Sequence, residues 1–363
     1  AVALVPSYIK KLSPYTPGKP IDQAKRETGL KNFIKLASNE NPFGISPLAL
    51  KSIEDSMHRL NRYPDASGFY LREKLAQKQN LKMQNVVLGA GSEGILSTIM
   101  RTFLLERDEI ISAKNSFIGF RILANASGRK THWIPMKNHK YNLKSMAKRI
   151  NENTKIIYIA NPDNPMGTYI TKQEFDSFYK YIPSRVLIIL DEAYYEFAQH
   201  LDDFPDTMLY RYDNVITLRT FSKAYGLAGL RIGYGFARED LIKNLMKVKA
   251  PFEPSIIAQM AGKAALGDNS FLEKTINSNN QEMNYLISEL DRLGIEIIRS
   301  ATNFLTTIWG SENEANKIAD FLFKNGIIIR KLVSFGWKNY LRISIGNHNE
   351  NKKLVGTLKK INE

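Results

Sequence analysis

The feature that most constrains the fold is an alternation of short, almost continuously apolar runs with helical patterns between about residues 85 and 237. Such runs are typical of strands that are buried on both faces of a mostly parallel sheet. Helical patterns lie between them, for example at 92–106 and at 171–182, where Thr171 and Glu174 predict a capping box. The predicted strands are 85–91, 108–113, 130–136, 155–162, 185–193, 214–222 and 230–237. This alternation predicts a doubly wound α/β domain.

The pattern changes after Pro254. A long amphipathic segment at about 255–293 is followed by short strands and helices that end in a basic helix, which is an α+β pattern. A chain of 363 residues is long enough for more than one domain. We therefore expect an extended N-terminal arm over 1–34, a large α/β domain over 35–250 and a smaller α+β domain over 251–363.

Composition argues against several classes of function. The net charge of +15 favours anionic ligands, but the basic residues are spread along the chain and form no zinc-finger, RNP or basic-zipper pattern. We therefore expect no nucleic-acid partner. No window approaches an uninterrupted membrane span, so no membrane partner is expected either. The absence of cysteine suits a reducing cytoplasm, and the five histidines lack the spacing of a zinc site, so we expect no metal.

Polar residues collect where the predicted strands end, which is where open parallel sheets bind their ligands. After the strand at 85–91, the turn "GAGSEG" places the amides of Ser92 and Glu93 at a helix N-terminus, where an anion binds favourably. A tight strand-to-helix turn without a ligand explains the same residues equally well. The turn also has the G-x-G-x-x-G spacing of nicotinamide enzymes, but no clear ribose-binding acid follows it.

Further polar groups follow the other strands. Asn164 lies in the loop "NPDNPMG", and Asp191 ends the next strand with Tyr194 after it, although an aspartate there is also a common helix cap. Ser222 and Lys223 lie in the small-residue corner "TFSKAYGLAGLRIGYG", where glycines let a ligand approach the backbone. A solvated lysine in a turn is the alternative. Together these groups favour pyridoxal phosphate, which needs a lysine for its aldehyde, a carboxylate for its pyridine nitrogen and donors for its phosphate.

The sequence resembles the histidinol-phosphate aminotransferases, a family of class II, fold-type I pyridoxal-phosphate-dependent aminotransferases. The motifs that carry the resemblance occur in the family's order between residues 35 and 346: "LASNENPFG", "RYPD", "NPDNPMG", "DEAYYEF", "RTFSKAYGLAGLRIGY" and "LRISIG". The resemblance implies a large domain with a mostly parallel sheet flanked by helices, and a smaller α+β C-terminal domain. It also implies a homodimer with shared active sites that acts on small amino- and keto-acid substrates.

The resemblance further implies a role for each candidate site residue. Lys223 would be the catalytic Schiff-base lysine, and Asp191 would be the partner of the pyridine nitrogen. Tyr194 and Asn164 would hydrogen-bond the phenolic oxygen of the cofactor, and Phe117 would stack on its ring. The cofactor phosphate would be held by Ser222, Arg231, the amides of Ser92 and Glu93, and Tyr63 from the neighbouring subunit.

For the substrate, the resemblance implies that Arg342 clamps an α-carboxylate as a bidentate fork. Tyr15 and Arg330 match the positions that hold the phosphate of histidinol phosphate, and a surface or interface charge is the alternative for Arg330. The chain departs from the family's usual pattern at Met166, where a threonine is common, and at Phe117, which lacks the hydroxyl of a tyrosine. Neither departure removes a catalytic role.

The implied reaction transfers an amino group between L-histidinol phosphate and 2-oxoglutarate, giving imidazole acetol phosphate and glutamate by a ping-pong mechanism, as part of histidine biosynthesis. Three alternatives stay open. They are an aromatic amino acid aminotransferase on the same scaffold, a pyridoxal-phosphate decarboxylase that acts on a phosphorylated amino acid, and a binding protein without activity.

Overall fold

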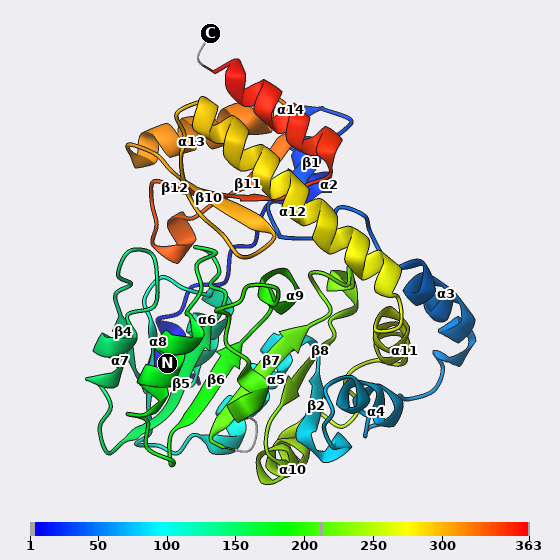
Figure 1. Cartoon of the computed structure of the whole chain (residues 1–363), viewed down its shortest axis with the longest axis vertical. Helices are drawn as coiled ribbons and strands as arrows, with labels where there is room; N and C mark the ends of the chain where they lie inside the picture. The colour runs from blue at the N-terminus through cyan, green and yellow to red at the C-terminus, as the bar shows by residue number, and fades with distance from the viewer. Residues whose placement is uncertain (1–3, 211–212, 362–363) are drawn as a thin grey trace.

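A seven-stranded sheet forms the centre of the larger part of the molecule (Figure 1). The computed structural model describes residues 4–210 and 213–361. In spatial order, the strands are β2 (Val86–Gly89), β8 (Gly233–Phe236), β7 (Val215–Thr220), β6 (Leu187–Asp191), β5 (Thr154–Ala160), β3 (Glu109–Ala113) and β4 (Lys130–Ile134). Strand β8 is antiparallel to both neighbours, whereas the other adjacent pairs are parallel. Each strand overlaps a predicted one, which confirms the doubly wound pattern.

Helices cover both faces of this sheet because the strands are apolar on both sides. Along β2, Val86 and Leu88 belong to one hydrophobic cluster and Val87 to another. The first cluster includes α4 and α11, and the second includes α5, α6 and α8. The helices of this part are α3 (Pro47–Ser56), η1 (Met57–Arg59), α4 (Phe69–Lys78), η2 (Met83–Asn85), α5 (Gly91–Phe103), α6 (Ile118–Ala126), α7 (Leu143–Ala147), α8 (Lys172–Tyr179), α9 (Tyr195–Ala198), η3 (Thr207–Tyr210), η4 (Ala228–Leu230), α10 (Glu239–Val248) and α11 (Ile256–Ala265).

The predicted capping box at the start of α8 is confirmed. The Thr171 hydroxyl accepts a hydrogen bond from the Glu174 amide at 3.2 Å, and the Glu174 carboxylate accepts one from the Thr171 amide at 2.8 Å. Two backbone donors that a helix start would leave unpaired are thereby satisfied.

The smaller part contains a five-stranded sheet in the order β1 (Ile34–Leu36), β11 (Ile327–Lys331), β12 (Tyr340–Ser344), β10 (Phe304–Ile308) and β9 (Glu296–Ile298). The pair β1–β11 is parallel and the others are antiparallel. Helix α12 runs from the larger part along the smaller one (Figure 1). The remaining elements are α1 (Ser7–Lys10), α2 (Ile21–Thr28), α12 (Asn269–Arg292), α13 (Glu312–Lys324), η5 (Val333–Phe335) and α14 (His348–Lys359).

The structure differs from the predicted division into an arm (1–34), a large domain (35–250) and a small domain (251–363). Strand β1 pairs with β11 and so belongs to the smaller sheet, and α11 packs on α3 and α4 in the larger part. The N-terminal segment is not simply extended, since it forms α1 and α2, and Ala24 of α2 is fully buried. Residues 1–3, 211–212 and 362–363 of the predicted units lie outside the described residues.

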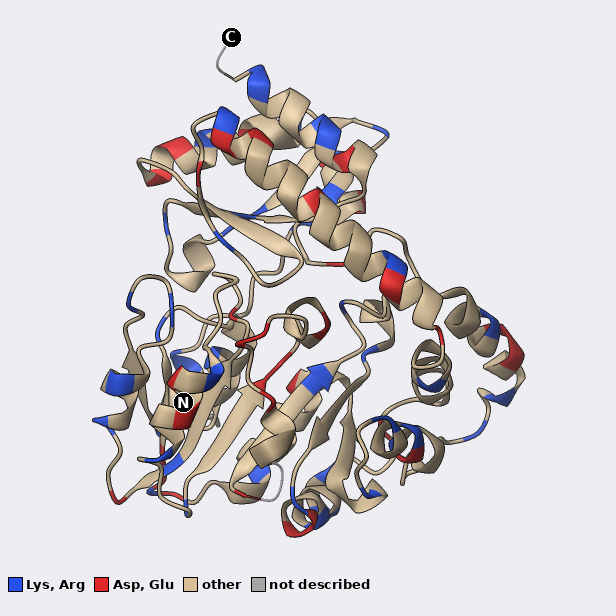
Figure 2. Ribbon diagram, viewed as in Figure 1, with Lys and Arg blue, Asp and Glu red and all other residues tan. Residues whose placement is uncertain are grey.

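Charge is distributed over the whole fold. Figure 2 shows Lys and Arg on helices and loops of both parts rather than on a single element. Among the described residues, no helix is both long enough and apolar enough to cross a membrane. The same residues contain no group of three or more histidine, cysteine or acidic side chains that could hold a metal ion.

Candidate active site

A cavity at the carboxyl ends of β5, β6 and β7 brings the predicted cofactor residues together. It is bounded by the start of α5 and by the turn between β7 and β8. Every residue predicted to contact the cofactor from within the same chain lines it, namely Ser92, Glu93, Phe117, Asn164, Asp191, Tyr194, Ser222, Lys223 and Arg231. The convergence follows from the parallel sheet, because its strands end at one edge.

Lys223 lies in this cavity rather than on a solvated turn. Its Nζ donates a hydrogen bond to the Ser38 carbonyl at 3.1 Å. Burial, followed by the positive charge of Arg342, lowers the pKa of the Lys223 amine to about 8. The small residues around it allow close packing, since a Cβ on Gly226, at φ +71°, would lie 2.2 Å from the Gly44 carbonyl oxygen. The corner therefore holds a buried lysine whose amine loses its proton more readily than that of an exposed lysine.

Asp191 is buried at the end of β6 with one oxygen unpaired. Its Oδ2 accepts a hydrogen bond from the Tyr158 hydroxyl at 2.7 Å, whereas its Oδ1 has no partner within the described part of the chain. Burial raises the pKa of this carboxyl to about 6, although the Tyr158 hydrogen bond acts in the opposite direction. The helix-cap alternative is not observed, because Tyr194 occupies the N-cap of α9. A buried, unpaired carboxylate oxygen is costly, which indicates a site for a ligand donor.

Tyr194 and Asn164 connect the cavity to the smaller sheet. The Tyr194 hydroxyl accepts a hydrogen bond from the Asn39 amide at 2.9 Å, and burial raises the pKa of this phenol to about 12. The Asn164 side-chain oxygen accepts a hydrogen bond from Arg342 on β12. The predicted substrate arginine therefore contacts a predicted cofactor residue directly.

The turn before α5 has the features of an anion site. Gly91, at φ +74°, starts the helix, and a Cβ at this position would lie 2.5 Å from Nη2 of Arg231. Ala90 at the N-cap gives no side-chain hydrogen bond, so the first amides of this helix, which include Ser92 and Glu93, have no capping partner. Arg231 also lies 3.4 Å from the Ser222 hydroxyl. Free amides, a hydroxyl and a guanidinium are the groups that hold a phosphate.

Two buried arginines face each other across β11 and β12. Arg330 and Arg342 are direct partners in the strand register and are 7% and 5% exposed. Neither forms an ion pair with a carboxylate among the described residues. Like charges directly opposite one another destabilise a sheet, and an anion bound between them would offset this repulsion. Burial lowers the pKa of Arg342 to about 10.

Arg330 and Tyr15 lie together, as predicted. An Nη2 of Arg330 lies 3.4 Å from the Tyr15 hydroxyl and donates to the Thr16 carbonyl at 3.2 Å. The alternative of a surface charge for Arg330 is excluded by its burial. Tyr15 is half exposed, so its ring and hydroxyl remain accessible to a ligand.

Tyr63 is the one predicted cofactor residue that lies outside the cavity of its own chain. It is 79% exposed, and its ring stacks on Phe252 with centroids 4.3 Å apart. This position is compatible with a contact to a second subunit.

Several site residues were missed by sequence reasoning. Tyr158 lies within an apolar run, but its spacing of two from Ala160 puts both on the cavity side. Asn39 is part of the motif "LASNENPFG" and has no separate signal in the sequence. Thr220, which lines the cavity and lies 3.0 Å from the Ser222 hydroxyl, ends β7 and is close to the end of a predicted strand, so its position could have indicated it.

Comparisons with known proteins agree with this geometry. The family profile for aminotransferase class I and II matches residues 31–358. A histidinol-phosphate aminotransferase 2 of Carboxydothermus hydrogenoformans is 38% identical over 362 residues, covering 99% of each chain. A histidinol-phosphate aminotransferase 1 of Mannheimia succiniciproducens is 40% identical over 354 residues, covering 97% of this chain and 96% of the relative.

Solved structures show the same fold. The crystal structure of histidinol-phosphate aminotransferase from Sinorhizobium meliloti in complex with pyridoxal-5'-phosphate superposes with a TM-score of 0.90 at 28% identity, covering 99% of both chains. An aspartate aminotransferase of Thermus thermophilus superposes with a TM-score of 0.85 at 18% identity over 99% of both chains, which shows the fold alone. The predicted fold-type I architecture is confirmed.

Proposed function

The chain belongs to the class I and II aminotransferases, within the histidinol-phosphate aminotransferase family, and we propose that its substrates are L-histidinol phosphate and 2-oxoglutarate. The products would be imidazole acetol phosphate and glutamate, formed by a ping-pong reaction in histidine biosynthesis. The observation that carries this proposal is the pair of buried arginines without carboxylate partners, Arg330 and Arg342, next to the candidate cofactor cavity. Both substrates bring anionic groups that such a pair can bind.

The residues of the cavity fit pyridoxal phosphate as the cofactor. The unpaired Oδ1 of Asp191 can accept a hydrogen bond from the pyridine nitrogen, and the Tyr194 hydroxyl and Asn164 amide can bind the phenolic oxygen. Phe117 can stack on the ring, while Ser222, Arg231 and the first amides of α5 can hold the phosphate. When bound, pyridoxal phosphate supplies a conjugated ring that withdraws electrons from the substrate Cα.

Lys223 has the properties of the proton carrier in this reaction. Its amine can bind the cofactor covalently in the resting enzyme and, once released, can take and return the proton at the substrate Cα. A pKa of about 8 makes the neutral amine accessible near pH 7, where an ordinary lysine would be almost fully charged. The positive charges of Arg342 and Arg231 contribute to this shift. The groups proposed to bind anions therefore also lower the pKa of the Lys223 amine.

The two arginines divide the recognition of the substrates. Histidinol phosphate has no α-carboxylate, so we infer that its phosphate binds Arg330 and Tyr15, which lie together at one side of the site. Glutamate has a carboxylate at each end, and Arg342 is positioned to bind its α-carboxylate because it hydrogen-bonds Asn164. A fixed guanidinium fork suits both kinds of anion.

We propose a homodimer in which Tyr63 contacts the cofactor phosphate of the partner subunit. Supporting this, the exposed Tyr63 stacks on the exposed Phe252, and exposed apolar side chains mark interaction surfaces when they gather. Neighbouring segments of the chain expose further apolar side chains, namely Met57, Leu60, Phe69 and Tyr70. They belong to η1, the residue after it and α4.

The proposed substrate is tested by offering purified enzyme glutamate together with either imidazole acetol phosphate or phenylpyruvate, and by measuring 2-oxoglutarate. We expect the phosphorylated acceptor to have the higher kcat/KM. A preference for phenylpyruvate would assign an aromatic aminotransferase instead. Release of carbon dioxide from a phosphorylated amino acid would assign a decarboxylase.

A further inference from the structure

A second cavity lies in the larger part of the fold, between α7, α8 and the segment 137–142 that precedes α7. It shares no lining residue with the candidate active site. Its volume of about 870 Å³ lies within the range of roughly 300–1,000 Å³ that is typical of small-molecule sites. The proposed reaction makes no use of it.

The walls of this cavity are apolar and partly aromatic. Leu143, Ala147 and Ile150 line one side, and Ile170 and Phe178 line the other. Tyr141 and Tyr181 also line the cavity, together with the polar side chains of Asn138, Asn142 and Ser177. Burying apolar surface away from water is favourable by about 25 cal/mol per Å². An open apolar cavity of this size therefore favours a ligand with an apolar body that covers its walls.

The rim of the cavity is strongly basic. Lys137, Lys140, Lys144 and Lys148 line it, against the single carboxylate of Glu174. Because Glu174 pairs with Lys140 at 3.1 Å, the other three lysines have no ion-pair partner within the residues that the structure describes. Lys144 and Lys148 are four residues apart, a spacing at which like charges repel on one helical face. An anion between them would relieve this repulsion.

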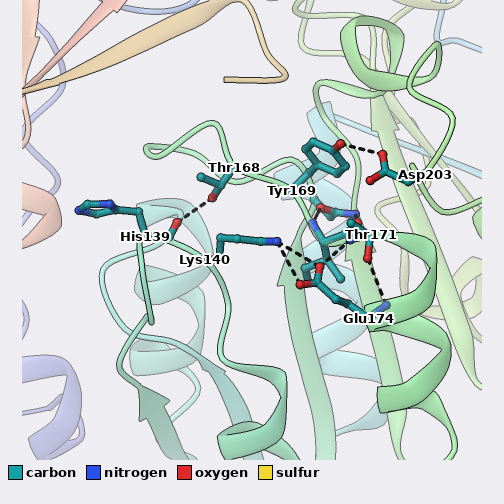
Figure 3. A network of polar contacts seen from close by, with 9 residues as sticks. His139, Lys140, Thr168, Tyr169, Thr171, Glu174 and Asp203 are labelled. Atoms are coloured by element: carbon teal, nitrogen blue, oxygen red, sulfur yellow. Dashed lines mark hydrogen bonds and ion pairs between the residues drawn. The ribbon is translucent and has the colours of Figure 1, made fainter. Parts of the chain in front are cut away.

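The cavity walls are held in place by hydrogen bonds. Figure 3 shows Lys140 extended toward Glu174, whose carboxylate also binds the Thr171 amide at the start of α8. In the same view, the Thr168 hydroxyl donates to the His139 carbonyl at 2.7 Å, which ties the segment before α7 to the loop before α8. The site is therefore formed before a ligand arrives, which lowers the entropic cost of binding.

We propose that this cavity is a binding site for a small amphipathic anion with an aryl body and a carboxylate. The apolar body lies against the ring of Phe178 and the side chains of α7, and the carboxylate binds Lys144 and Lys148. The three unpaired lysines select the negative charge, and the aromatic walls select the aryl body.

The test is isothermal titration of the holoenzyme with three matched probes. We expect 4-phenylbutanoate to bind with one molecule per chain, and 4-phenylbutan-1-ol, which has the same body without the charge, to bind at least tenfold more weakly. Butanoate, which keeps the charge without the aryl group, is expected to bind at least tenfold more weakly as well. Equal affinity of the acid and the alcohol, or no binding of 4-phenylbutanoate at millimolar concentration, would overturn the proposal.

Reversing the charge of two lysines that line the cavity tests whether 4-phenylbutanoate binds there. The double variant Lys144→Glu/Lys148→Glu is expected to weaken 4-phenylbutanoate binding at least tenfold. The control Lys172→Glu/Lys180→Glu alters two exposed lysines at the ends of α8 that do not line the cavity, and is expected to bind within twofold of wild type. Wild-type affinity in the first variant, as binding in the active site would give, would contradict the proposal.

Discussion

Single residues in this site combine a structural cost with a chemical role, and Asp191 is the clearest case. Its carboxyl is buried, one oxygen is unpaired, and its pKa is raised to about 6 from 3.8. A carboxyl pKa that folding raises destabilises the folded protein progressively between about pH 3.8 and 6, and fully above pH 6. The same charge is what a pyridinium nitrogen requires.

We predict that Asp191→Asn stabilises the cofactor-free protein while turnover falls at least a hundredfold. The shift of about two pKa units corresponds to roughly 2–3 kcal/mol at pH 7. This difference should shrink as the pH falls from 6 toward 4, because the folded carboxyl is then protonated and the carboxylate of the unfolded wild type becomes protonated as well. Chemical unfolding at pH 7 and pH 4.5 measures the effect, and a less stable variant at pH 7 would contradict it.

A second prediction concerns the binding of the substrate phosphate by Arg330. Arg330→Ala should raise the KM for histidinol phosphate about ten- to a hundredfold, because a charge-assisted contact is worth roughly 1.5–3 kcal/mol. The KM for glutamate should change much less. Lys331→Ala, which removes the adjacent exposed charge, is the matched control. An equal rise in KM for both substrates would mean that Arg330 has only a structural role.

At the start of α5, the backbone geometry depends on a glycine. Gly91 has a positive φ, and a Cβ at this position would lie 2.5 Å from Nη2 of Arg231, so the guanidinium would have to move. We predict that Gly91→Ala weakens pyridoxal phosphate binding about tenfold or more, since it strains the turn and displaces the arginine. Gly229→Ala is the control, because a Cβ there meets nothing within 4 Å and φ is ordinary. Equal dissociation constants for the two variants, measured by equilibrium dialysis, would refute the phosphate site.

At the level of elements, sequence reasoning succeeded where the signal is local and failed where it depends on tertiary pairing. The apolar runs of β5, β6 and β7 predicted a buried sheet, and the chain order placed polar residues such as Asp191 and Lys223 at one edge. Local pattern does not show that β1 pairs with β11, or that α11 packs on α3. Tyr158 was missed because its ring resembles any core aromatic until the position of Asp191 is known.

The whole molecule is expected to work as a dimer, because Tyr63 lies outside the cavity of its own chain. We predict that Tyr63→Phe and Lys223→Ala proteins, each of low activity, regain activity when mixed under conditions that exchange subunits. One site of each hybrid dimer would then combine an intact Lys223 with an intact Tyr63 from the partner. Activity equal to the average of the two parents, or a monomer in sedimentation, would rule out a shared site.

Covalent binding of pyridoxal phosphate by Lys223 is tested most directly by borohydride reduction of the holoenzyme, followed by digestion and mass spectrometry of the peptides. We predict a phosphopyridoxyl group on the peptide that contains Lys223, in about one copy per chain, and none in the Lys223→Ala protein. A label on another lysine, or a native protein that cannot be loaded with the cofactor, would contradict the account.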